Sequence, residues 1–121
     1  MKPTIALFTG DPAGIGPELV AKLLANGEAQ RAADILLIGS RDVVHAGMRA
    51  AGSEFVYERG PAVRGPAIPR LVDWEHVNAT GFAHGEVAAR NGAYMLAGLA
   101  LGLDLARRGI ADAICFAPLV L

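Results

Sequence analysis

The first elements of the fold are decided by residues 4–25, which read TIALFTGDPAGIGPELVAKLLA. The apolar run that opens this stretch is typical of a buried strand, and residues 17–25 have the apolar spacing of a helix. A glycine-rich loop, residues 9–16, lies between them. Pro17 suits the first position of a helix, where a backbone N–H has no partner to lose. Glu18 suits the positive end of the helix dipole. The stretch therefore predicts a strand, a loop and a helix in succession.

The spacing of the glycine loop is close to two common phosphate-binding motifs and matches neither. The dinucleotide fingerprint needs the pattern G-x-G-x-x-G, and no third glycine follows Gly16 at that distance. A P-loop needs Lys and then Ser or Thr where this chain has Ile15 and Gly16. The free N–H groups at the start of the helix can still hold a phosphate or a carboxylate. Spacing alone leaves a ligand-facing loop and a purely structural turn equally open.

Asp11 is the residue of this loop best placed for chemistry. It follows a strand and could orient a substrate hydroxyl or bind a cationic group. The favoured alternative is an Asx turn, in which the carboxylate accepts a hydrogen bond from its own backbone. The residues predicted to shape a cleft for substrate or cofactor are Thr9, Gly10, Asp11, Pro12, Ala13 and Gly14. No catalytic residue and no metal ligand is predicted within this chain.

The other reactive side chains have structural interpretations. Cys115 lies in the apolar run 113–117 and is predicted to be a buried thiol without a disulfide partner, because it is the one cysteine of the chain. His45, His76 and His84 are scattered and lack the close spacing of a zinc or iron site. We therefore expect none of these four side chains to act directly in chemistry.

Composition restricts the class of protein. Hydrophobic residues make up 53% of the 121-residue chain, which suffices for one core. Eleven basic and twelve acidic residues nearly cancel, and no basic stripe supports nucleic-acid binding. The least charged window, residues 91–103, is too short to cross a bilayer, and no leader peptide is recognisable. These features predict a soluble cytoplasmic protein with neither nucleic acid nor membrane as a partner.

Strands and helices alternate along the chain. Further strands are predicted at 34–39, 55–57, within 68–72 and at 113–117, with helices at 41–51, capped by Ser40, and from 85 or 86 to 108. Three prolines in 59–69 predict a loop there. This alternation predicts an α/β fold with a mostly parallel, three-layer α/β/α sheet, because continuous apolar strands need cover on both faces. The long last helix is apolar on most sides and is predicted to be buried on more than one face. The loops 9–16 and 117–118 are predicted to meet at the carboxyl edge of the sheet, where such folds bind ligands.

The literal residues of the first loop carry a resemblance. The stretch 10–18, GDPAGIGPE, resembles the N-terminal signature of the 4-hydroxythreonine-4-phosphate dehydrogenase family. Gly85-Glu86-Val87 before the long helix, and residues 109–114 leading to Ala117-Pro118-Leu119, resemble the family's later helix, strand and loop in order and spacing. The resemblance runs from residue 4 to residue 119 and so covers nearly the whole chain.

This resemblance implies a fold similar to part of the isocitrate and isopropylmalate dehydrogenases. It implies NAD or NADP and a divalent metal ion as cofactors, and a small phosphorylated hydroxy acid as substrate. The family oxidises 4-phosphooxy-L-threonine in pyridoxal phosphate biosynthesis and works as a homodimer. Relatives with the same signature act on phosphorylated threonate or erythronate, or on a terephthalate cis-dihydrodiol, and nothing in these residues chooses among them.

The chain also departs from the family. Family members are considerably longer, and their main substrate contacts and three metal-binding histidines follow the Ala-Pro-Leu loop, where this chain reads Val120-Leu121. We therefore expect residues 1–121 to be a single N-terminal α/β segment of a larger two-domain enzyme, with an apparently truncated fold and no activity alone. A non-catalytic phosphate-binding module and a fragment without a function of its own remain the alternatives.

Overall fold

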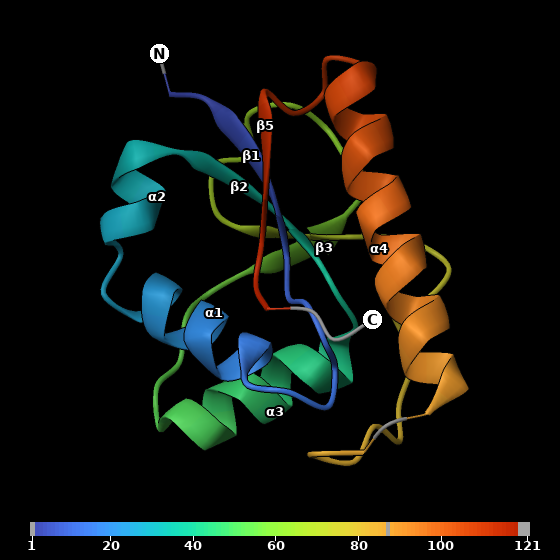
Figure 1. Cartoon of the computed structure of the whole chain (residues 1–121). Helices are drawn as coiled ribbons and strands as arrows, with labels where there is room; N and C mark the ends of the chain where they lie inside the picture. The colour runs from blue at the N-terminus through green and yellow to red at the C-terminus, as the bar shows by residue number, and fades with distance from the viewer. Residues whose placement is uncertain (1, 87, 119–121) are drawn as a thin grey trace.

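The computed structural model describes residues 2–86 and 88–118 and contains one sheet with helices on both faces (Figure 1). In chain order the elements are β1 (Thr4–Phe8), α1 (Gly16–Ala25), α2 (Glu28–Ala32), β2 (Asp34–Ile38), α3 (Arg41–Ala51), β3 (Glu58–Gly60), β4 (Arg70–Val72), α4 (Ala89–Arg107) and β5 (Ala113–Phe116). The strand order is β3-β4-β2-β1-β5, and every described strand pair is parallel. Val87 and Leu119, two residues of the family resemblance, lie outside the described residues.

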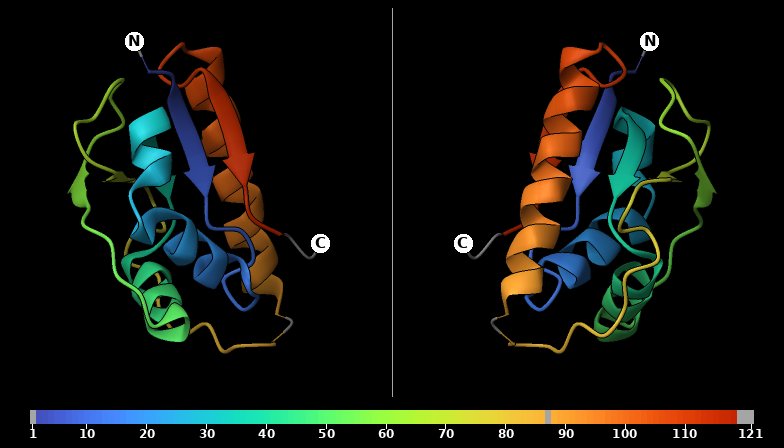
Figure 2. Two further views of the ribbon diagram at one scale, coloured as in Figure 1. Left: turned by 90° about the vertical axis from the view of Figure 1, so that its left-hand side faces the viewer. Right: turned by 90° about the vertical axis from the view of Figure 1, so that its right-hand side faces the viewer.

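The sheet is the middle of three layers, as predicted. The helices α1 and α3 cover one face and α4 covers the other (Figure 2). Along β1 the side chains alternate, so that Leu7 packs toward α1 and α3 while Ala6 and Phe8 pack toward α4. The strands β1 and β2 are buried on both sides, which explains their continuous apolar runs. The sequence-predicted fold class is confirmed.

The third strand lies later in the chain than the sequence predicts. We expected it at 55–57 and a loop from 59, whereas β3 covers Glu58–Gly60. The Arg70 guanidinium donates to the Glu58 carboxylate at 2.7 Å, and this ion pair joins β3 to β4. Phe55 and Tyr57 instead pack against the core from an extended segment outside the ladder. The prediction of a strand at 55–57 is therefore wrong, and Arg59 and Gly60, which were expected in the loop, belong to β3.

Helix α4 begins later and is less buried than predicted. It begins at Ala89 rather than at 85 or 86, since Ala83 and Glu86 form a separate turn closed by the Glu86 N–H and the Ala83 carbonyl at 3.0 Å. Its outer side is open, with Leu96 62% and Leu103 63% exposed. The prediction of burial on more than one face is wrong, because only the sheet side of α4 has a packing partner among the described elements.

Cys115 is exposed, which corrects the prediction of a buried thiol. The strand β5 pairs with β1, and within residues 2–86 and 88–118 no strand lies on its other side. An apolar strand at an edge leaves side chains accessible that would be covered in a central strand. In the same part of the chain, no helix has both the length and the hydropathy that crossing a membrane requires.

Candidate functional site

The loops that follow β1 and β5 meet at the carboxyl edge of the sheet, as the sequence predicts. The Asp11 N–H donates to the Pro118 carbonyl at 3.1 Å, and the Ala117 N–H donates to the Phe8 carbonyl at 3.1 Å. Gly10 has a φ of 82°, and a Cβ there would lie 2.6 Å from the Pro118 oxygen. Only glycine combines this backbone conformation with so close an approach. The contact fixes the start of the glycine loop.

Asp11 forms the Asx turn that the sequence analysis favours. Its carboxylate Oδ1 accepts a hydrogen bond from the Ala13 N–H at 2.9 Å, and its carbonyl accepts one from the Gly14 N–H at 3.1 Å. The residue is 9% exposed. The carboxylate therefore organises the loop from within, and the N–H groups of Asp11, Ala13 and Gly14 all have partners inside the protein.

The N-terminus of α1 is open. Ile15 occupies the N-cap position with helical dihedrals, φ −88° and ψ −7°, and makes no side-chain cap. Among the hydrogen bonds of residues 2–86 and 88–118, none uses the N–H of Ile15, Gly16 or Glu18. A Cβ on Gly16 would overlap the Thr9 carbonyl, so glycine is needed where the helix begins under the loop. The first turn thus presents unpaired donors at the positive end of a helix dipole.

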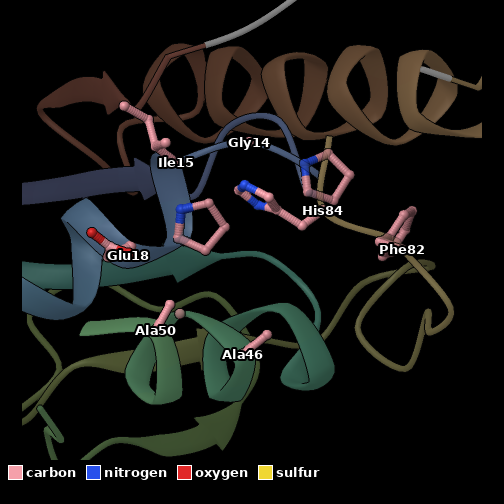
Figure 3. Close-up of a pocket in the computed structure, with 10 residues that line it drawn as sticks. Gly14, Ile15, Glu18, Ala46, Ala50, Phe82 and His84 are labelled. Atoms are coloured by element: carbon pink, nitrogen blue, oxygen red, sulfur yellow. The ribbon is translucent and has the colours of Figure 1, made fainter. Parts of the chain in front are cut away.

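A cavity of about 210 Å³ lies directly beside this helix end (Figure 3). It is lined by Pro12, Gly14, Ile15, Pro17, Glu18, Ala46, Gly47, Ala50, Phe82 and His84. The small residues on α3 leave the space open, and the rings of Phe82 and His84 stand on the other side from Glu18. Of the six residues predicted to shape a cleft, Pro12 and Gly14 line the cavity, while Thr9, Gly10 and Asp11 hold the loop from beneath. Ala13 is buried and accepts a hydrogen bond through its carbonyl.

His84 and Phe82 enter the site from the segment between β4 and α4, and sequence reasoning missed both. The Gly85 N–H donates to the Ala13 carbonyl at 2.7 Å, which holds this segment against the glycine loop. Arg90 stacks over the Phe82 ring, with 4.6 Å between its guanidinium carbon and the ring centroid. Residues 73–88 have no periodic pattern, so no local signal could place them.

Tyr94 lies on α4 and connects that helix to the residues that follow β1 and β2. Its hydroxyl accepts a hydrogen bond from the Ser40 N–H at 3.0 Å and shares another with the Thr9 hydroxyl at 3.3 Å. Burial raises the pKa of the Tyr94 phenol, so it stays protonated and can donate to Thr9. Its ring is surrounded by the rings of Phe8, Trp74, His76 and Phe82. One buried side chain of α4 therefore fixes the ends of β1 and β2.

The residues present do not fit the metal that the resemblance implies. Within the described ranges, no three His, Cys, Asp or Glu side chains come close enough together to hold a metal ion. His45 does not line the cavity to which His84 belongs, and its Nε2 lies 2.8 Å from the Tyr57 hydroxyl. No metal-dependent step can therefore be assigned to these side chains.

The proteins whose sequences resemble this chain have similar names. No protein-family model matches the chain. The chain is 45% identical over 121 residues to a putative 4-hydroxythreonine-4-phosphate dehydrogenase 2 of Pseudomonas aeruginosa, covering 97% of this chain and 36% of the relative. It is 42% identical over 124 residues to a putative 4-hydroxythreonine-4-phosphate dehydrogenase of Pasteurella multocida, covering 98% and 37%. A D-threonate 4-phosphate dehydrogenase of Bordetella bronchiseptica is 34% identical over 122 residues, covering 97% and 35%.

Solved structures agree with these relatives. A 4-hydroxythreonine-4-phosphate dehydrogenase from Burkholderia phymatum superposes with a TM-score of 0.86 at 26% identity, covering 99% of this chain and 37% of that one. The enzyme of the same name from Klebsiella pneumoniae gives 0.79 at 28% identity, covering 98% and 38%. The segment thus has the α/β architecture of part of a dehydrogenase.

More specifically, the chain is homologous to part of the 4-hydroxythreonine-4-phosphate dehydrogenases, which confirms the resemblance carried by residues 10–18. It spans a little over a third of the length of the curated relatives it matches.

Proposed function

We propose that these residues are the N-terminal α/β segment of a larger two-domain dehydrogenase that oxidises 4-phosphooxy-L-threonine with NAD or NADP. Two observations support this proposal. The relatives named for that activity match 97–98% of the chain, and the open N-terminus of α1 lies beside a small cavity at the carboxyl edge of the sheet. The second observation supports the local part of the proposal, because parallel α/β folds bind their ligands at this edge of the sheet.

The role of this segment is to bind and position an anionic group of the substrate. The unpaired N–H groups of Ile15, Gly16 and Glu18 suit a phosphate or carboxylate oxygen. The Glu18 carboxylate lines the same cavity and lies 3.1 Å from the Lys22 ammonium. An anion bound at the loop would therefore have a carboxylate nearby, and a substrate that also carries an ammonium group would satisfy both ends of the cavity.

The oxidation itself is assigned to groups outside this chain. The described residues do not form a metal site, and we place the divalent metal ligands in the part of the relatives that this chain does not span. The nicotinamide cofactor and the homodimeric state are likewise expected from the family resemblance for the longer protein. Residues 9–16 position substrate, and no proton or hydride transfer is assigned to them.

A second substrate has a specific observation in its favour. Two relatives, 32% and 34% identical to this chain, are named for D-threonate 4-phosphate. That substrate shares the phosphate with 4-phosphooxy-L-threonine and has a hydroxyl in place of the amino group. The two are distinguished by the partner available to Glu18, since only an amino group brings a positive charge to its carboxylate.

A chimera tests the proposal. The matching segment of the Pseudomonas relative is replaced by residues 1–118 of this chain, and NAD(P)H formation from each of the two substrates is measured against the unmodified relative. We expect the chimera to oxidise 4-phosphooxy-L-threonine. Gly16→Ala should raise KM more than it lowers kcat, because it disturbs a binding loop. A folded chimera with no activity, beside an active parent, would contradict the proposal.

The chain alone gives a complementary measurement. We expect the 121-residue protein to reduce neither NAD nor NADP with either substrate, with or without Mg²⁺ or Zn²⁺. A steady, enzyme-proportional rate would show that the chemistry is carried by these residues and would overturn their assignment as a positioning segment.

A further inference from the structure

One side of the cavity is built from a segment that belongs to no helix or strand. Phe82 and His84 lie between β4 and α4, and both line the cavity. Two glycines of this segment, Gly81 and Gly85, have φ values of 83° and 76°. Because the segment has no backbone ladder of its own, its position depends on its contacts with neighbouring elements. We call residues 82–86 the cavity wall.

The cavity wall is attached on two sides through adjacent residues. The Gly85 N–H donates to the Ala13 carbonyl of the glycine loop at 2.7 Å. The Glu86 carbonyl accepts a hydrogen bond from the side-chain Nδ2 of Asn91, on α4, at 3.0 Å. Ala13 is itself held by the Asp11 carboxylate, which accepts its N–H. These hydrogen bonds form a continuous link from α4 through the cavity wall to the glycine loop.

The environment of Asn91 favours a role other than stability. Asn91 lies in the first turn of α4 and is 4% exposed, and within residues 2–86 and 88–118 its Oδ1 has no hydrogen-bond partner. The Glu86 carbonyl fixes the orientation of the amide, since only Nδ2 can donate to it. A buried polar atom without a partner carries a desolvation penalty comparable with what one hydrogen bond contributes. Replacing the amide by an apolar side chain removes the bond and the unpaired oxygen together, so we expect little change in stability.

We propose that Asn91 is a positioning residue of the substrate cavity, because its amide holds the cavity wall against the glycine loop and so places the His84 and Phe82 rings. Asn91 does not itself line the cavity, so it acts through the wall and not by touching substrate. Small displacements of groups that surround a substrate weaken its positioning. The inference rests on the proposed function, since it gives Asn91 a part in binding the same anionic substrate.

Amide hydrogen exchange of the ¹⁵N-labelled 121-residue chain tests the attachment of the wall without any ligand. In Asn91→Leu, the Gly85 amide should exchange about fivefold faster, because the wall has lost its hydrogen bond to α4. Asn91→Ala is the second variant and should act in the same direction, with a smaller side chain that cannot crowd the site. Circular dichroism verifies that both variants are folded.

Gln30 provides a matched control far from this link. Its Nε2 makes one hydrogen bond, to the Leu24 carbonyl at 2.8 Å, and its buried Oε1 has no partner among the described residues. Gln30 does not line the cavity. Gln30→Met therefore removes the same set of groups as Asn91→Leu, and the two variants should have similar midpoints of urea unfolding. Only the variants of Asn91 should alter the exchange of Gly85.

The chimera described above tests the consequence for substrate. Asn91→Leu should raise KM for 4-phosphooxy-L-threonine by about fivefold and change kcat by less than about twofold, because a misplaced wall weakens binding. Gln30→Met should change neither constant. Unchanged Gly85 exchange in both Asn91 variants would overturn the inference, and so would faster exchange with an unchanged KM. A folded, inactive chimera would instead overturn the proposed function, and with it the role in substrate binding, while faster Gly85 exchange would still show that Asn91 attaches the wall.

Discussion

Two strand-to-helix connections leave the same edge of the sheet in different ways. The connection from β2 to α3 is short, and Ser40 caps the helix by accepting the Val43 N–H at 3.0 Å. The Arg41 N–H is bonded to the Val77 carbonyl at 2.8 Å. The connection from β1 to α1 takes residues 9–15, ends on Ile15 and provides no side-chain cap. The N-terminus of α3 is therefore closed by the protein itself, and the N-terminus of α1 is left open.

The two connections lie at the same carboxyl edge of the sheet, and the difference between them distinguishes a structural connection from a candidate binding site. In an isolated domain, capping a helix by Ser, Thr, Asp or Asn stabilises the fold by about 1 kcal/mol. The β1–α1 connection lacks a side-chain cap and therefore lacks this stabilisation. Its loop is nevertheless held in place by the Asp11 carboxylate and by the hydrogen bond to the Pro118 carbonyl. A rigid loop that leaves donors unpaired beside a cavity is what a binding site requires. The closed connection has a structural role, and the open one is the candidate site.

The largest expected effect concerns the close approach that opens α1. Gly16→Ala drives a Cβ into the Thr9 carbonyl, and we expect it to lower the free energy of unfolding by about 3 kcal/mol. Gly52→Ala is the matched control, because a Cβ on Gly52 would meet nothing within 4 Å. Only its φ of 63° opposes the substitution, at a cost of about 1 kcal/mol. Urea denaturation measures both. Equal costs would show that the loop has room to relax at Gly16.

The sequence predicts the open connection well and its surroundings poorly. The strand, loop and helix of residues 4–25 follow from local periodicity, and the Asx turn of Asp11 follows from its own backbone neighbours. His84 was missed because it is brought to the loop by the Gly85 bond to Ala13, far away in sequence. Tyr94 was missed because its partners Ser40 and Thr9 lie 54 and 85 residues away. Local patterns contain no information on such contacts.

Tyr94→Phe tests the link between the two connections. It leaves the buried Ser40 N–H without a partner, and we expect it to cost about 2 kcal/mol of unfolding free energy. The Ser40 amide should also exchange faster with solvent. The control is Tyr57→Phe, whose hydroxyl bonds the exposed His45 and whose loss should cost less than about 0.5 kcal/mol. Unchanged Ser40 exchange in Tyr94→Phe would show that the hydroxyl does not couple the strands.

Substitutions at the two N-cap positions are expected to change stability the least. Ser40→Ala should destabilise the protein by about 1 kcal/mol, because the Val43 N–H loses its acceptor. Ile15→Ser should change stability by less than about 0.5 kcal/mol, since the helical dihedrals of Ile15 do not place a side chain for capping. Thermal denaturation compares the two. A clear gain from Ile15→Ser would mean that the open end of α1 is an ordinary cap position occupied by a poor residue.

The most direct test of the open site is a titration of the ¹⁵N-labelled chain, followed amide by amide, with 4-phosphooxy-L-threonine and separately with inorganic phosphate. The account predicts saturable shifts at the amides of Gly14, Ile15, Gly16 and Glu18 and at His84. It predicts no shifts at residues 41–43, where the helix end is closed. Equal shifts at the two helix ends, or shifts that leave residues 14–18 unmoved, would contradict the assignment of the β1–α1 connection as the ligand site.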